Sequence, residues 1–273
     1  MIKKIESLFL NVYLNIRSLL IVLFFSKKSK INLSNSSNAC ILLNGPSLLN
    51  DLKKNKLRGE IYVSNDFALT DEFRIIKPNN YVLVDPFFFN NNKRSKNIFN
   101  SIFNAEWNIN LYLPVKYKPL FNKRINKNYI KIYYFNHYEI SGNSALTHKI
   151  FNFRLGMPKC QNVLIAILMI CIWKNHSLIN LYGSDHNWIH YLTLDKKNNL
   201  CLSNHRFFDI SKEKKIKPWL DQHGNNYKMD EILSKLSLMF KGYNEIAYYS
   251  KIKKIKIINK TKNSLIDAFK KNI

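Results

Sequence analysis

Polar residues that could bind a ligand stand at the point where an apolar run of this chain stops. Residues 41–43 are apolar, and Asn44, Gly45, Pro46 and Ser47 follow them directly. Gly-Pro followed by a hydroxyl residue is typical of a sharp turn from a buried strand into a helix. The free N–H groups and partial positive charge of a helix start favour an anion. The turn therefore points to the phosphate of a nucleotide, although the same residues fit a purely structural corner equally well.

The same arrangement recurs at three further predicted strand ends. Polar residues follow each apolar run: Asn65 and Asp66 after 60–64, Asp85 after 80–84, and Gly183, Ser184 and Asp185 after 178–182. The carboxyl ends of parallel strands meet at one edge of the sheet, where open α/β sheets bind ligands. Amides and carboxylates at this edge can hydrogen-bond to a ribose, a base or sugar hydroxyls. The turn preference of Asn and Asp explains each position by itself just as well.

A general base could come from the histidines that follow the last of these runs. His186 stands directly after Asp185 and is a site candidate, and His205 is followed by Arg206. An imidazole titrates near neutral pH and could deprotonate a hydroxyl, while a guanidinium offsets phosphate charge. The histidines lack the spacing of a metal-binding helix, and the chain has no Asp-x-Asp sequence. A divalent cation that bridges a nucleotide diphosphate is therefore not indicated, and no metal ligand is predicted.

Composition and missing motifs exclude several classes of protein. The chain has 273 residues, 46% of them hydrophobic, which suffices for one large domain. Its net charge of +25 comes from lysines scattered along the whole chain without any nucleic-acid-binding motif, so an anionic membrane surface or substrate is favoured over nucleic acid. No Gly-x-Ser-x-Gly or GxxxxGK[ST] sequence is present. The four cysteines are far apart, which suggests a reducing cytosol.

The N-terminal segment is apolar with basic flanks. Asn11, Asn15 and Arg17 interrupt the run between residues 8 and 25, which fits neither a spanning helix nor a signal peptide. An amphipathic helix lying on the inner leaflet is the preferred interpretation, with an ordinary helix docked on the domain as the alternative. We expect a membrane-associated helix over residues 1–31, a polar linker over 32–38 and one catalytic domain over 39–273.

Strands and helices alternate in that domain. This order predicts a mostly parallel, Rossmann-like α/β sheet flanked by helices. The expected strands cover residues 39–43, 60–64, 80–84, 107–113, 130–134, 178–182 and 252–258, and the expected helices cover 161–173 and 229–249.

The ordered set of motifs resembles a known family. Residues 44–48 (Asn-Gly-Pro-Ser-Leu), Asn65, Asp85-Pro86, the helix over 161–173, residues 181–185 (Leu-Tyr-Gly-Ser-Asp), His205 and residues 263–266 are similar, in that order, to bacterial sialyltransferases of glycosyltransferase family 42. The similarity spans residues 39 to 270. It implies a single GT-A-variant-like domain with a small lid, which uses CMP-sialic acid without a metal and inverts the anomeric centre.

The resemblance also implies roles for individual residues. His205 would be the base that deprotonates the acceptor hydroxyl. The nucleotide and donor would be held by Asn44, Gly45, Pro46, Ser47, Asn65, Asp85, Gln161, Asn162, Gly183, Ser184 and Asp185. Trp188 and Tyr191 are the nearest candidates for the two lid tyrosines that hold the leaving phosphate in that family, and Arg206 is a further candidate because of its charge. Asp85 stands where the family has Asn, and Gln161-Asn162 where it has Ser-Gly, so a donor other than CMP-sialic acid is an alternative.

The sequence therefore predicts a glycosyltransferase of bacterial surface polysaccharide synthesis, such as O-antigen, capsule or lipooligosaccharide. Its expected partners are a nucleotide sugar, a glycan or lipid-linked glycan acceptor and the cytoplasmic face of the inner membrane. No cofactor is expected beyond the donor, and a homo-oligomer is left open. Two alternatives remain: a Mg²⁺-dependent phosphoryl or pyrophosphoryl transferase that resembles pterin pyrophosphokinases, and a non-catalytic scaffold docked on a membrane.

Overall fold

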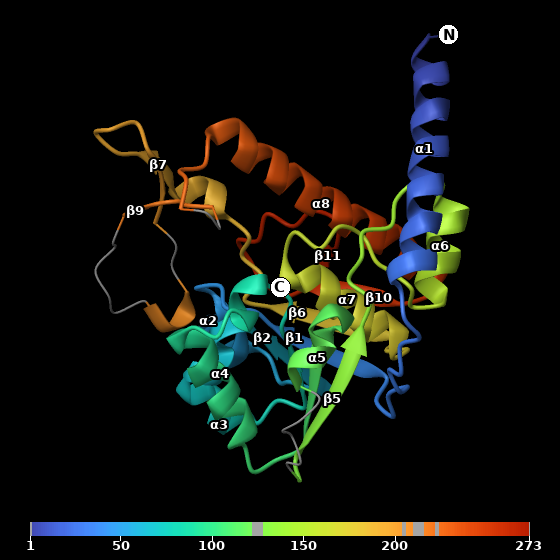
Figure 1. The fold of residues 1–273 in the computed structure, drawn as a ribbon. Coiled ribbons are helices and arrows are strands. Elements are labelled where there is room, and N and C mark those ends of the chain that lie inside the picture. The colour runs from blue at the N-terminus through green and yellow to red at the C-terminus, as the bar shows by residue number, and fades with distance from the viewer. Residues whose placement is uncertain (1, 122–127, 204–205, 210–215, 222–223, 273) are drawn as a thin grey trace.

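The chain folds around one parallel sheet (Figure 1). The computed structural model describes residues 2–121, 128–203, 206–209, 216–221 and 224–272. Eight strands pair in the order β11-β10-β6-β1-β2-β3-β4-β5, and every neighbouring pair is parallel. They are β1 (Asn38–Leu42), β2 (Glu60–Ser64), β3 (Asn80–Val82), β4 (Ile109–Pro114), β5 (Ile130–Phe135), β6 (Leu178–Tyr182), β10 (Lys256–Asn259) and β11 (Lys270–Lys271). The predicted α/β class is confirmed.

Helices cover both faces of the sheet because both faces are apolar. In β1, Ala39 and Ile41 belong to one buried cluster, while Cys40 and Leu42 belong to the other. The first face is covered by α6 (Ser144–Asn152), α7 (Val163–Trp173) and α8 (Met229–Ile252). The second is covered by α2 (Leu48–Lys54), α3 (Asp71–Ile76), α4 (Lys93–Phe103) and α5 (Lys118–Phe121). Side chains packed on both sides fix the strand ends in space.

Short elements occupy the loops. The 3₁₀ turns are η1 (Asn65–Leu69), η2 (Pro86–Phe89), η3 (Val115–Tyr117), η4 (Trp188–Tyr191) and η5 (Phe207–Asp209). A small antiparallel sheet of β7 (Leu192–Leu194), β8 (Leu200–Leu202) and β9 (Lys217–Pro218) lies between β6 and α8 in the sequence. Figure 1 shows this insertion beyond the edge of the main sheet, on the side where α8 begins.

Helix α1 (Ile2–Phe25) projects from the body (Figure 1). Its second half is attached by polar contacts: Ser18 donates to the carbonyl of Ser141 at 2.6 Å, and Asn15 accepts from the backbone N–H of Asn143 at 2.8 Å. The window Leu8–Phe25 is long and apolar enough to cross a membrane, and only 6% of it is buried. The polar residues that interrupt this apolar run therefore include those that fasten it to the domain.

Several element boundaries differ from the sequence prediction, among them the end of the strand expected over 80–84, which stops at Val82. The last expected strand begins at Lys256 rather than at 252, because α8 continues to Ile252. The expected strand over 107–113 begins at Ile109. The helix expected from 161 begins at Val163, since the side chain of Asn162 accepts from the N–H of Leu164 and caps it.

Candidate functional site

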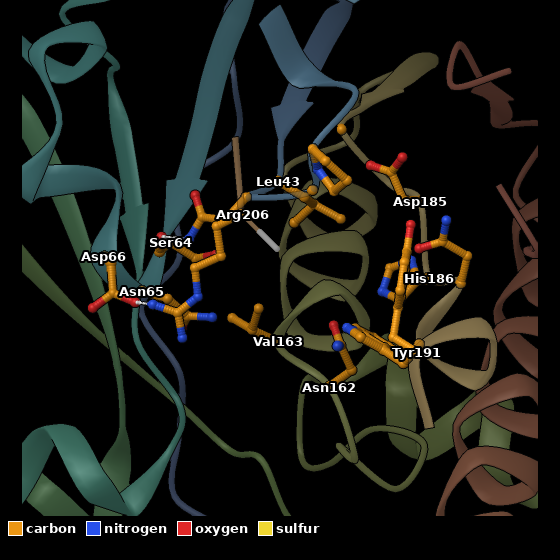
Figure 2. Close-up of a pocket in the computed structure, with 16 residues that line it drawn as sticks. Leu43, Ser64, Asn65, Asp66, Asn162, Val163, Asp185, His186, Tyr191 and Arg206 are labelled. Carbon is orange, nitrogen blue, oxygen red and sulfur yellow. Dashed lines mark hydrogen bonds and ion pairs between the residues drawn. The ribbon is translucent and has the colours of Figure 1, made fainter. Parts of the chain in front are cut away.

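A cavity of about 160 Å³ lies at the carboxyl ends of β1, β2 and β6. In Figure 2, Asn65, Asp66 and Arg206 lie on one side of it, and Asp185, His186 and Tyr191 lie on the other. This is the edge at which parallel α/β sheets bind ligands. Of the predicted site residues, those that line it are Asn44, Gly45, Pro46, Asn65, Asn162, Gly183, Asp185, Trp188, Tyr191 and Arg206.

The remaining predicted residues have other positions. Ser47, Asp85, Gln161 and Ser184 are not among the lining residues. Asp85 is exposed and accepts from the N–H of Phe87 at 2.9 Å, which starts η2. Ser184 is fully buried, and its hydroxyl donates to Asn259 at 2.8 Å. His205, the predicted base, lies outside the described residues.

Two glycines allow the ends of β1 and β6 to meet. The N–H of Gly45 donates to the carbonyl of Gly183 at 3.1 Å. A Cβ on Gly45 would stand 2.0 Å from Oδ2 of Asp185 and 2.3 Å from that carbonyl oxygen. Gly183 has a φ of +61°, and a Cβ there would stand 2.5 Å from the carbonyl oxygen of Leu43. Glycine is thus needed at both positions because two backbones touch.

The carboxylate of Asp185 occupies the start of α2. It accepts from the hydroxyl of Ser47 at 2.9 Å and from the N–H of Ser47 at 3.4 Å. Burial is the main effect that raises the pKa of Asp185, and the charge of Asp51 adds to it, while the contacts with Ser47 oppose it. The position that the sequence suggested for a ligand phosphate therefore already holds an anionic side chain.

Asp51 connects the turns after β1 and β6 to the segment that follows β10. Its Oδ2 accepts from the N–H of Gly183 at 2.9 Å and from the hydroxyl of Thr261 at 2.7 Å, and it shares the single hydroxyl hydrogen of Ser47, at 3.1 Å, with Asp185. Thr261 follows β10, and its hydroxyl also accepts from the N–H of Ser184. These bonds hold β1, β6 and the segment after β10 in one arrangement.

Three buried polar atoms of lining residues have no hydrogen-bond partner in the described part of the chain. They are Oδ1 of Asn44, Oδ1 of Asn65 and Nδ1 of His186. Asn44 uses its Nδ2 to donate to the carbonyl of Ser64 at 3.3 Å, which fixes the orientation of that amide. Buried polar atoms are nearly always paired, so these three are candidates for hydrogen bonds to a ligand or water.

His186 is a neutral group at physiological pH. Burial lowers its pKa to about 4, and its Nε2 lies 3.2 Å from the hydroxyl of Tyr243. The indole of Trp188 packs edge-on against its ring at 4.7 Å between centroids. His186 therefore offers a ligand a neutral ring nitrogen rather than a positive charge.

Positive charge reaches the cavity through Arg206. This guanidinium and that of Arg94 both bond to the carboxylate of Asp66, whose side chain is only 4% exposed. Asp66 follows β2 as the sequence indicated, and Arg94 comes from α4. The ion pairs place the segment that contains Arg206 against the end of β2, and Arg206 lines the cavity whereas Arg94 does not.

Sequence reasoning missed four lining residues: Leu43, Ser64, Val163 and Asn187. Each is the immediate neighbour of a predicted site residue or of His186, so the signal that could have found them is adjacency to a strand end or a helix start.

No group of three or more His, Cys, Asp or Glu side chains suited to a metal ion occurs among the residues that the structure describes. Comparison of the chain with models of protein families, with curated proteins and with solved structures finds no match.

Proposed function

We propose that the chain is a metal-independent glycosyltransferase that binds a nucleotide-activated sugar in the cavity at the ends of β1, β2 and β6. The sugar would be an acidic one activated with CMP, such as sialic acid, and the acceptor a hydroxyl of a glycan or lipid-linked glycan of bacterial surface polysaccharide. The observation that carries the proposal is the set of unpaired buried acceptors, Oδ1 of Asn44 and Oδ1 of Asn65, at this edge.

These acceptors favour a ligand rich in hydrogen-bond donors. An amino group on the base or the hydroxyls of ribose and sugar would satisfy the oxygens of Asn44 and Asn65, as well as the carboxylate of Asp185. The amino group of cytosine is such a donor, whereas the matching position of uracil is a carbonyl oxygen that would face another oxygen. The cavity thus supports a cytidine nucleotide better than a uridine nucleotide.

The leaving phosphate would lie near Arg206 and η4 rather than at the start of α2. Asp185 occupies the N–H and hydroxyl of Ser47, and its charge would repel a phosphate there. Arg206 brings a guanidinium to one side of the cavity, and Tyr191 lies on the opposite side, where Trp188 and Tyr191 line the cavity from η4. These three side chains would stabilise the charge that develops as the sugar departs. His205, next to Arg206 in the sequence, would take the proton of the acceptor hydroxyl.

Helix α1 would place the domain on the cytoplasmic face of the inner membrane. The residues that face away from the body form an apolar stripe along its length: Phe9, Val12, Tyr13, Ile16, Leu19, Leu20, Leu23 and Phe24 are each at least 49% exposed. Among the described side chains of α1, Asn15 is the first that bonds to the body, and residues 2–14 before it span about 20 Å, whereas a membrane crossing needs about 30 Å. An interfacial helix fits these contacts better than a spanning one.

A thermal-shift panel tests the binding half of the proposal. CMP, CDP, UDP, GDP and ATP would each be added to the full chain with EDTA or with Mg²⁺. We expect CMP to raise the melting temperature in EDTA, and UDP to raise it less. No stabilisation by CMP would contradict the proposal. Stabilisation by ATP only with Mg²⁺ would instead support the phosphoryl-transfer alternative, and no response to any nucleotide would favour a non-catalytic scaffold.

A transfer assay tests the mechanism. His205→Ala should abolish transfer from a CMP-sugar to a glycan acceptor and leave the CMP-induced thermal shift in place, because a base acts on the acceptor and not on the nucleotide. His190→Ala is the matched control, since His190 does not line the cavity. Unchanged transfer by the His205 variant would remove this residue from the mechanism.

A further inference from the structure

A second hollow, of about 770 Å³, lies beside edge strand β5. Five lysines from three separate segments line it: Lys27, Lys28, Lys30, Lys118 and Lys131. The rings of Tyr133 and Tyr134 form part of its wall. We refer to these seven residues as the lysine groove. It shares no lining residue with the cavity at the ends of β1, β2 and β6.

The charge of the lysine groove is uncompensated within the described ranges. All five lysines are exposed, and none is within ion-pair distance of a described carboxylate. Two of them extend over aromatic rings: Nζ of Lys131 lies 5.4 Å from the ring centre of Tyr133, and Nζ of Lys118 lies 5.9 Å from that of Tyr134. Like charges that gather at one place repel each other, so an anion bound there is stabilised.

The lysine groove is attached rigidly to the end of α1. The N–H of Lys27 donates to Oδ1 of Asn136 at 2.9 Å, and Nδ2 of Asn136 donates back to the carbonyl of Lys27 at 2.6 Å. Ser29 donates to the carbonyl of Tyr134 in β5 at 3.2 Å. Figure 1 shows the segment after α1 descending beside β5. The exposed apolar stripe of α1 therefore leads directly to the lysines.

We propose that the lysine groove binds the phosphate headgroup of an anionic phospholipid in the leaflet on which α1 lies. This inference rests on the membrane association in the proposed function and adds the lipid class. An apolar helix face followed by clustered lysines matches the order of acyl region and charged headgroups in a bilayer. The tyrosine rings suit the boundary between these regions, since their apolar bodies carry a polar tip. A nucleic acid could bind the lysines, but it would leave the apolar stripe of α1 exposed to water.

Vesicle flotation of the full chain tests this inference. Neutral phosphatidylcholine vesicles would be compared with vesicles that also contain phosphatidylglycerol. We expect tighter binding to the anionic vesicles, and the double variant Lys118→Glu/Lys131→Glu should lose this preference, with affinity for them reduced about tenfold or more. Binding to neutral vesicles through α1 should persist in the variant. The control Lys53→Glu/Lys54→Glu changes the charge equally, at exposed lysines of α2, which covers the opposite face of the sheet from α1.

Other outcomes overturn the inference in distinct ways. Equal binding of the chain to both kinds of vesicle, or an unchanged preference in the groove variant, would contradict it. Thermal stabilisation by inorganic phosphate that the groove variant loses, without any preference between vesicles, would identify a site for a soluble anion instead. The nucleotide panel is a separate readout, so its failure would reject the proposed function without altering the vesicle result.

Discussion

The hydroxyl of Ser47 donates to the carboxylate of Asp185 over 2.9 Å, and this bond joins the turn after β1 to the turn after β6. It gives the Gly-Pro-Ser motif a role that the isolated motif does not reveal. The side-chain anion of Asp185 takes the donors that a ligand phosphate was expected to use. Gly45 permits the contact, because any larger residue would collide with the same carboxylate.

Gly45→Ala should disrupt this corner. The new Cβ would stand 2.0 Å from Oδ2 of Asp185 and 2.3 Å from the carbonyl oxygen of Gly183, so the two turns must separate, at a cost of about 3 kcal/mol in the free energy of unfolding. Nucleotide-induced stabilisation should disappear as well. Gly224→Ala is the control: a Cβ there meets nothing within 4 Å, and its φ of +87° adds only backbone strain of about 1–2 kcal/mol. Denaturant unfolding with and without CMP compares the two, and an equal effect on CMP binding would reject the assignment of the corner to the ligand site.

Arg206→Gln and Arg94→Gln separate structure from ligand binding. Both remove a guanidinium from the carboxylate of Asp66, but only Arg206 lines the cavity. We expect similar losses of stability in the two variants. The Arg206 variant should also bind CMP about ten to a hundred times more weakly, since a charge-assisted hydrogen bond contributes about 1.5–3 kcal/mol. Isothermal titration of both variants measures this, and equal affinities would move the phosphate away from Arg206.

Asp185→Asn should separate stability from function. Burial raises the pKa of Asp185, which means that its charged form is less favourable in the folded than in the unfolded chain, so a neutral isostere should leave the ligand-free protein equally stable or more stable at pH 7. The variant should nevertheless respond less to CMP, because an amide accepts hydroxyl hydrogens more weakly than a carboxylate. Melting curves with and without CMP test both parts.

Asp195→Asn is the control for that variant, because loss of this charge should lower the stability of the protein instead of preserving or raising it. The amide and N–H of Asn199 lower the pKa of Asp195, so removal of its charge should destabilise the protein slightly. Asp195 does not line the cavity, and its variant should keep the full response to CMP. A lower melting temperature for the ligand-free Asp185 variant than for the Asp195 variant would show that the charge of Asp185 holds the corner together.

The fold could be predicted from local patterns, and much of the cavity could be predicted from strand ends. Apolar runs such as residues 178–182 are typical of strands buried in a parallel sheet. The carboxyl ends of β1, β2 and β6 meet because these strands are neighbours in the sheet. The same argument predicts Asp85 at the cavity, but this prediction is wrong. Strand β3 already ends at Val82, and the exposed Asp85 caps η2. Proximity along the edge depends on where each strand stops, which composition does not fix.

Partnerships between distant residues were beyond the reach of sequence reasoning. Ser184 belongs to a predicted strand-end triplet, yet its hydroxyl donates to Asn259, whereas its neighbour Asp185 lines the cavity. The contact of Asp51 with Thr261 joins residues 210 positions apart. Such pairs arise from the register of β10 against β6, in which Ile258 pairs with Asn180, and a single sequence carries no signal for that register.

The pH dependence of stability should report on His186. Its pKa is about 4 in the folded chain and about 6.5 when unfolded, so the unfolded state binds an extra proton between these values. The free energy of unfolding should therefore fall as the pH drops from about 6.5 to 4, by at most about 3 kcal/mol from this residue. His186→Gln should flatten this part of the curve and weaken the response to CMP, because His186 lines the cavity and its buried Nδ1 has no partner among the described residues.

His137→Gln is the matched control for that curve. Burial and the charge of Lys116 lower the pKa of His137 to about 4 as well, so its variant should also reduce the acid-induced loss of stability. His137 does not line the cavity, however, and the response of its variant to CMP should stay as large as that of the unaltered chain. Denaturant melts at a series of pH values, with and without CMP, separate the two histidines. A His137 variant that loses the CMP response, or a His186 variant that keeps it, would show that the unpaired ring nitrogen of His186 is not a ligand contact.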